Sequence, residues 1–195
     1  MNATRFTIQL SSFIFVFALI IGSDMRALAQ DGHSHGTTSS DQKNDAATLL
    51  KIVRESTERF QDVSAAEAEG YVLTFGCVSG SDYGAMGLHY VNFALVSSGV
   101  LDPTRPQIVI YEPTPNGRPR LIGADYLVLA DTWNKTHSAP PQVMGQLLHL
   151  FESPNRFGLP AFYTLHVWAW KENPNGAFVN WHPKVSCDTF SAPTL

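Results

Sequence analysis

Apolar residues occupy both faces of a stretch near the C-terminus, Gly158 to Trp170. A run with no polar face predicts a strand that crosses the middle of a domain and is covered on both sides. One ionisable residue, His166, lies inside this run. A buried histidine must be neutral and hydrogen-bonded, or bound to a metal, to offset its lost hydration.

Shorter apolar runs predict four more strands, at Tyr71–Phe75, Gly87–Asn92, Gln107–Glu112 and Arg120–Leu129. The last two flank Asn116-Gly117, a pair typical of a two-residue hairpin turn. Ile108 then faces Asp125, and Glu112 faces Leu121. Glu112 and Asp125 share one face in this register, but about 13 Å separates them along the strands, too far for one metal ion.

Helices are predicted before these strands and between them, from apolar residues at helical spacing. Asp45 predicts the cap of a helix from Ala46 to Phe60, and Ser64 opens a short helix that ends at Gly70. A third helix is predicted over Gln142–Phe151, and a returning strand over Ala177–Trp181. Helices followed by a meander indicate an α+β domain, with N-terminal helices packed on a mostly antiparallel sheet or partly closed barrel.

The first 29 residues have the three parts of a secretory signal peptide. Arg5 gives the positive start, an apolar core follows, and Ala27-Leu28-Ala29 fits a cleavage site. The alternative is an uncleaved anchor, but the apolar run is short for a membrane-spanning helix. We therefore predict a signal peptide over 1–29, a disordered polar tail over 30–44 and one domain over 45–195, located in the periplasm or secreted, with no stable membrane insertion after cleavage.

Charge argues against nucleic acid as a partner. The chain has 13 basic and 17 acidic residues, and removal of Arg5, Asp24 and Arg26 with the signal leaves 11 and 16, a net charge of −5. Such a chain lacks the basic surface that phosphate backbones require. His33 and His35 in the tail could hold a metal loosely, although a solvated linker is the simpler interpretation.

Two cysteines, Cys77 and Cys187, follow the signal. An even count in an oxidising compartment predicts a disulfide between them. A reactive thiol pair is the alternative, but the Cys-x-x-Cys spacing that would support it is absent from the sequence.

The common sequence motifs of hydrolases, nucleotide-binding enzymes and zinc peptidases do not occur in this chain. Polar residues within or next to the predicted strands remain as candidates for chemistry: His89, Glu112, Asp125, His166 and His182. Imidazoles and carboxylates on neighbouring strands are the ligands from which a β-scaffold builds a site for a divalent transition metal. The residue set predicts a metal site at His89 and His166 with Asp125 or Glu112.

Each candidate also has a purely structural interpretation. His89 and His166 could be core histidines hydrogen-bonded to carbonyl groups. Asp125 lies within a strand, where aspartate is unfavourable and needs a reason. Glu112 ends a strand and could instead pair with Arg118 or Arg120. His182 is expected to be half-exposed, and His137 and His149 to lie at the surface.

Aromatic residues suggest a second kind of site. The four tryptophans, Trp133, Trp168, Trp170 and Trp181, could line a pocket for a small aromatic or apolar ligand. Ordinary core packing is the alternative, and it must hold for Trp168 or Trp170, because neighbouring strand positions alternate in direction.

Six short segments carry a resemblance to known proteins: Gly87–Asn92, Leu101–Pro106, Tyr111–Arg118, Gly158–Tyr163, His166–Lys171 and Val185–Cys187. Together they resemble a family of uncharacterised secreted bacterial proteins over nearly the whole mature domain. The resemblance implies export but no activity, so no catalytic residue follows from it.

Three functions thus fit the sequence. The first is an exported protein with a metal-binding or polar pocket, which as an enzyme would suit metal-assisted hydrolysis or oxygen chemistry on a small molecule. The second is a non-catalytic module for a small aromatic or apolar ligand, and the third is a structural envelope protein.

Overall fold

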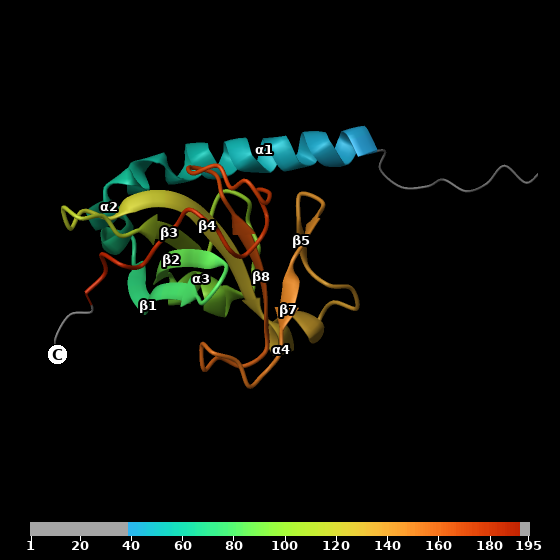
Figure 1. Cartoon of the computed structure of the whole chain (residues 1–195). Helices are drawn as coiled ribbons and strands as arrows, with labels where there is room; N and C mark the ends of the chain where they lie inside the picture. The colour runs from blue at the N-terminus through green and yellow to red at the C-terminus, as the bar shows by residue number, and fades with distance from the viewer. Residues whose placement is uncertain (1–38, 192–195) are drawn as a thin grey trace, which may run out of the picture. The chain divides into compact units, whose positions relative to one another are not determined.

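The computed structural model describes residues 39–191, which form helices on a curved antiparallel sheet (Figure 1). The sheet has six strands in the order β1 (Val72–Gly80), β2 (Gly84–Val91), β3 (Ile108–Glu112), β4 (Arg120–Leu129), β8 (Phe162–Val167) and β7 (His149–Phe151). The predicted α+β class is therefore confirmed. The predicted signal peptide and residues 30–38 of the predicted tail lie outside the described residues. Within residues 39–191 no helix has the length and apolar character needed to cross a membrane.

Helix α1 (Ser39–Thr57) begins earlier than the sequence indicates. Residues 39–44 belong to it, so the predicted disordered tail does not extend over them, and Asp45 lies inside the helix rather than at its cap. The segment contains no glycine or proline to stop helix propagation, and Asp41 in the first turn favours the helix dipole. A 3₁₀ turn (Glu58–Gln61) and α2 (Val63–Ala68) follow, with Asp62 rather than Ser64 capping α2.

Segment 142–151 is wrongly predicted as a helix. It forms β5 (Gln142–Val143), β6 (Gln146–Leu147) and β7. Met144 and Gly145 both have positive φ, 47° and 73°, which is the backbone of a tight hairpin turn between β5 and β6. Methionine is rare at such a position, so the sequence gives little warning of this turn.

The returning strand predicted over 177–181 is also wrong, although the turn before it forms, with the Gly176 N–H donating to the Asn173 carbonyl at 3.0 Å. The chain instead crosses to β2, where Ala85 and His182 form an isolated bridge. Two further helices, α3 (Phe93–Ser98) and α4 (Ala130–Asn134), occupy loops between strands.

The β3–β4 register places Ile108 opposite Asp125, as the sequence predicts. Glu112 faces Arg120 rather than Leu121, because the register shifts between Ile110 and Tyr111. The connection is also longer than a two-residue turn and spans residues 113–119. Prolines at both ends of that connection lack the N–H needed to extend the ladder.

The two faces of the sheet have different roles. Leu49 and Val53 of α1 pack on one face, against Tyr126 and Val128 of β4 and Leu165 of β8. The opposite face carries alternate residues of β2, β3, β4 and β8, which are mainly apolar: Val91, Ile108, Ile110, Leu127, Phe162. Polar residues that point to this second face are therefore enclosed by apolar neighbours.

Candidate functional site

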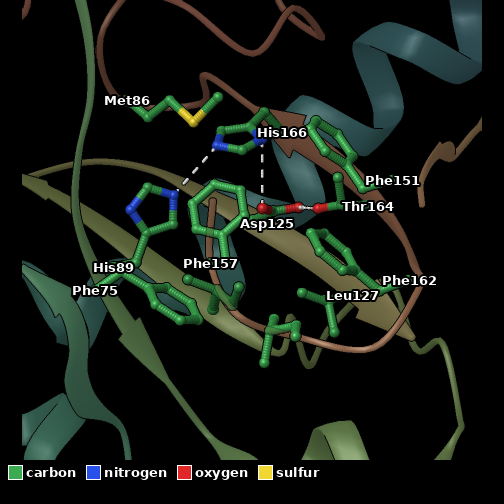
Figure 2. A pocket seen from close by; sticks show the side chains of 12 residues that line it. Phe75, Met86, His89, Asp125, Leu127, Phe151, Phe157, Phe162, Thr164 and His166 are labelled. Atoms are coloured by element: carbon green, nitrogen blue, oxygen red, sulfur yellow. Dashed lines mark hydrogen bonds and ion pairs between the residues drawn. The ribbon is translucent and has the colours of Figure 1, made fainter. Parts of the chain in front are cut away.

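Three ionisable side chains meet on the second face of the sheet: His89 of β2, Asp125 of β4 and His166 of β8 (Figure 2). Their exposed fractions are only 3%, 2% and 3%. Asp125 and His166 are direct cross-strand partners, while His89 reaches the pair from across β3. Across residues 39–191, this is the one group of three or more potential metal ligands whose ligand atoms all lie within 4.8 Å of one another.

The backbone fixes the protonation of His89. Its Nδ1 lies 3.1 Å from the Gly87 carbonyl oxygen, which can only accept, so Nδ1 carries the proton and Nε2 carries a lone pair. Gly87 has φ of 96°, and a Cβ atom there would lie 2.5 Å from the Tyr111 carbonyl oxygen. Only glycine fits this position, and it supplies the carbonyl that orients His89.

Asp125 is held by the neighbouring strand. Its Oδ1 accepts hydrogen bonds from the Thr164 hydroxyl at 2.5 Å and from the Leu165 N–H at 3.1 Å. Burial raises the pKa of Asp125 to about 6, although these hydrogen bonds and His89 favour the ionised form. The strand aspartate that the sequence leaves unexplained is thus an anchored carboxylate beside His166.

His166 lies between the other two residues. Its Nδ1 is 3.3 Å from Asp125 Oδ2, in contact but without the alignment of a full hydrogen bond, and its Nε2 is 3.4 Å from His89 Nε2. Burial lowers the pKa of His89 to about 4, with His166 adding to the effect, and lowers that of His166 to about 3, with a smaller effect from His149. Both imidazoles are therefore neutral at neutral pH, the state in which histidine binds metals.

The contact between the two Nε2 atoms is either an N–H···N hydrogen bond, with the proton on Nε2 of His166, or an approach of two lone pairs that a cation must bridge. The Asp125 carboxylate favours a proton on Nδ1 of His166, as carboxylates do behind metal-bound histidines. Nε2 of His166 then presents a lone pair to the lone pair of His89 Nε2. Within residues 39–191 neither Nε2 atom has another hydrogen-bond partner. A shared proton or a metal ion would turn this repulsion into attraction.

The spacing of the two nitrogens suits a metal ion. Zinc binds histidine nitrogen at about 2.0–2.1 Å, and tetrahedral geometry then places two nitrogens about 3.3–3.4 Å apart. The observed separation of 3.4 Å agrees with this value. The two imidazoles can therefore serve as neighbouring ligands of one ion without rearrangement of the sheet.

Apolar side chains surround the site, and half of them are phenylalanines. The adjoining cavity measures about 20 Å³, little more than one water molecule requires. Phe75 comes from β1, Phe151 from β7, Phe162 from β8, and Phe157 from the loop between β7 and β8 (Figure 2). The cluster thus faces a small space with apolar walls.

The structure does not bring Glu112 to this site. Its carboxylate accepts a hydrogen bond from Lys171 Nζ at 2.6 Å and pairs with Arg120. Burial raises the pKa of Glu112, but the bonds from Lys171 and Arg120 outweigh burial and leave the pKa below its ordinary value. Glu112 is therefore an ion-pair residue at the far end of β3, and only Asp125 joins the histidines.

The other histidines also lie outside the cluster. His137 and His149 are exposed, as predicted. The expectation of a half-exposed His182 is wrong, because the residue is fully buried. Its Nε2 donates to the Glu172 carbonyl at 3.0 Å, and its Nδ1 accepts from the Lys184 N–H at 3.0 Å. Both ring nitrogens are satisfied, so His182 has a structural role.

The tryptophans do not line the cavity beside the histidines. Trp168 is buried in the core and donates to the Val179 carbonyl, and Trp170 donates to the Thr57 hydroxyl at 3.0 Å. Trp133 stacks on His137, and Trp181 lies near Tyr83. The cavity does have an aromatic wall, as the sequence suggested, but phenylalanines form it and not tryptophans.

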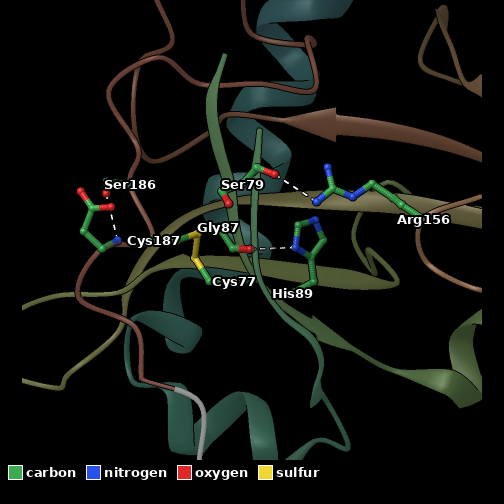
Figure 3. Close-up of a disulfide and its surroundings, with 8 residues drawn as sticks. Cys77, Ser79, Gly87, His89, Arg156, Ser186 and Cys187 are labelled. Atoms are coloured by element: carbon green, nitrogen blue, oxygen red, sulfur yellow. Dashed lines mark hydrogen bonds between the residues drawn. A yellow bond between two sulfur atoms is a disulfide. The ribbon is translucent and has the colours of Figure 1, made fainter. Parts of the chain in front are cut away.

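The predicted disulfide is confirmed. Cys77 of β1 and Cys187 of the C-terminal segment are bonded, with their Cα atoms 5.7 Å apart. Cys77 is the cross-strand partner of Leu88, between Gly87 and His89 (Figure 3). The bond therefore secures the C-terminal segment to the strand pair that positions His89.

Two supporting residues escape the sequence analysis. Gly87 orients His89, and Thr164 holds Asp125. Thr164 could have been found from its position two residues before His166, because residues i and i+2 of a strand share a face. The phenylalanines could not be grouped from the sequence, since they come from four separate segments.

Comparison with known proteins gives no match: no protein-family model, no curated protein and no solved structure matches this chain. The site must therefore be interpreted from its own geometry.

The metal-free protein is expected to lose stability as the pH falls from about 6.5 to about 4. In that range the unfolded chain protonates both histidines, whereas the folded chain protonates only Asp125, whose pKa is raised to about 6. The net difference of one proton corresponds to about 1.4 kcal/mol per pH unit. Denaturant unfolding in a chelating buffer at pH 7 and pH 5 measures the loss.

A double variant, His89→Asn with His166→Asn, is the control for this pH dependence. It keeps Asp125, whose protonation stabilises the folded state as the pH falls. It removes the two histidines, whose protonation stabilises the unfolded state. Its stability should rise on acidification, where that of the wild type falls, and an equal loss in both proteins would contradict the pKa shifts.

Proposed function

We propose that this chain is an exported metal-binding protein in which one divalent transition-metal ion is held between Nε2 of His89 and Nε2 of His166. The observation that carries the proposal is the 3.4 Å approach of two neutral imidazole nitrogens that have no other polar partner within residues 39–191. Zinc, copper and iron are all suited to imidazole ligands.

Asp125 is assigned a positioning role behind His166. One carboxylate oxygen faces Nδ1 of His166 at 3.3 Å, while the other is held by Thr164 and Leu165. A carboxylate in this position fixes the ring and increases the basicity of the metal-binding nitrogen. Its negative charge also offsets part of the charge of the buried ion, which burial alone would disfavour.

Two protein ligands leave coordination positions for water or a small molecule. Such open positions distinguish catalytic from closed structural metal sites. In this chain they would face the phenylalanine-lined cavity, where water is largely excluded. This arrangement supports metal-dependent binding of a small molecule rather than a purely structural ion.

Export is part of the proposal because two independent features support it. The first 29 residues have the pattern of a signal peptide. The Cys77–Cys187 disulfide belongs to an oxidising environment such as the periplasm or the exterior of the cell.

Metal titration tests the proposed function. Chelator-treated protein should bind one equivalent of Zn²⁺ or Co²⁺, and Asp125→Asn should weaken that binding about 10–100-fold, the usual effect of losing such a carboxylate. Because His33 and His35 could bind metal separately, the titration is repeated with both replaced by alanine. Absence of a stoichiometric site in this tail variant would reject the proposal.

A further inference from the structure

We propose that the metal pocket accepts a small molecule with an apolar body and no charge away from its metal-binding atoms, and that Phe157 limits the size of that molecule. The inference rests on the proposed metal site and adds the class of ligand. It comes from the chemistry of the cavity wall, from the small size of the cavity and from the way one loop closes it.

The wall offers polar contacts only at its base. Apart from His89, Asp125, His166 and Thr164, every lining residue is apolar: Phe75, Met86, Ile108, Leu127, Phe151, Phe157, Leu159, Phe162. The Thr164 hydroxyl is already bonded to Asp125. Among residues 39–191 no lysine or arginine lines the cavity, so a second charge on a ligand would be buried without a partner, at a high cost in free energy.

Size is the second restriction. The cavity of about 20 Å³ accommodates an ion with little more than a water-sized ligand. A ligand the size of a benzene ring therefore requires part of the wall to move.

Phe157 is the one phenylalanine of the wall that does not lie on a strand. Three of the four phenylalanines lie on sheet strands, whereas Phe157 lies on the loop of residues 152–161, which we call the Phe157 loop. Its ring is in contact with those of Phe75, Phe151 and Phe162, with centroids 5.2, 6.3 and 6.0 Å away. The Phe157 ring thus joins the aromatic side chains of three strands.

The Phe157 loop has its own internal support. The Asn155 side chain donates to the Glu152 and Leu159 carbonyls and accepts from the Phe157 and Leu159 N–H groups. The loop therefore keeps its shape through its own hydrogen bonds. Arg156 secures it to β1 by donating to the Ser79 carbonyl at 3.0 Å, and its guanidinium lies 5.7 Å from the Trp181 ring (Figure 3).

Ligand binding to the Co²⁺-loaded protein tests the inference, because cobalt reports a new ligand in its visible spectrum. The probes are azide, phenol and 4-hydroxybenzenesulfonate. The last two share a phenol oxygen and differ by one remote sulfonate, a permanent charge that binds metal ions only weakly. Phenol should bind at least about ten-fold more tightly than 4-hydroxybenzenesulfonate.

Phe157→Ala tests the size limit. Removing the ring should tighten phenol binding about ten-fold, as the barrier to a ring-sized ligand is lost, and leave azide binding within about two-fold. Phe93→Ala is the matched control, because Phe93 is half-exposed at the start of α3 and does not line the cavity. It should leave all three affinities unchanged.

Two results would overturn the inference while the metal site stands. The first is equal binding of phenol and 4-hydroxybenzenesulfonate. The second is an unchanged phenol affinity in a Phe157→Ala variant that has bound cobalt normally. Failure of cobalt to bind the wild-type protein would instead overturn the proposed metal function itself, so the two failures are distinguishable.

Discussion

His166→Ala will bind Zn²⁺ about 100–1000-fold more weakly than the wild-type protein. Complete zinc sites with four protein ligands have apparent binding free energies of about 10–16 kcal/mol, so one ligand accounts for roughly 3–4 kcal/mol. The substitution removes one of the two proposed ligands and also leaves Asp125 without its neighbour. Competition with a chromophoric chelator measures the change in affinity.

Two controls separate loss of a ligand from general damage to the fold. His137→Ala removes an exposed histidine that stacks on Trp133 and should keep wild-type affinity. His182→Gln disturbs a fully buried histidine outside the cluster, so it tests whether damage to the core alone reduces metal binding. Equal affinities for the wild type and His166→Ala would contradict the assignment of His166 as a ligand.

Replacement of both Cys77 and Cys187 by alanine will lower the free energy of unfolding by about 2–5 kcal/mol. The bond closes a long loop, since 110 positions separate the two cysteines. Its loss increases the conformational freedom of the unfolded chain and releases the C-terminal segment from β1. Denaturant unfolding of the oxidised wild type and the double variant measures the difference.

Mass spectrometry of the unreduced protein provides the control for that comparison. It should find Cys77 and Cys187 in one linked peptide. If the wild type contains the bond and the double variant still has the same free energy of unfolding, the stabilising role of the disulfide is contradicted.

Strand patterns in the sequence predict much of the site. The hairpin turn expected at Asn116-Gly117 places Ile108 opposite Asp125, and the continuous apolar run at Gly158–Trp170 places His166 in a strand covered on both sides. The estimated spacing along β3 and β4 already separates Glu112 from Asp125. These inferences succeed because each depends on the local sequence of one strand or one hairpin.

The assembly of the cluster could not be predicted in this way. Asp125 meets His166 because β8 pairs with β4, and the choice of partner strand depends on packing across the whole sheet. The prediction of a helix over 142–151 failed for a similar reason. Its last residues pair with β8, and tertiary pairing outweighs a local helical pattern.

At the N-terminal boundary of α1, the sequence-based prediction failed because it expected too little regular structure. Residues 39–44 are polar and were predicted to be disordered, yet they extend α1. Their composition lacks apolar residues to pack, but it also lacks a helix breaker. A preformed helix anchored by Leu49 and Val53 can propagate into such a segment.

The position of the metal tests the central claim most directly. Crystals of the Co²⁺-loaded protein, measured at the cobalt absorption edge, should show one anomalous peak about 2.0–2.1 Å from Nε2 of both His89 and His166. A peak at His33 and His35 alone, or no peak between the two Nε2 atoms, would contradict the proposed metal site.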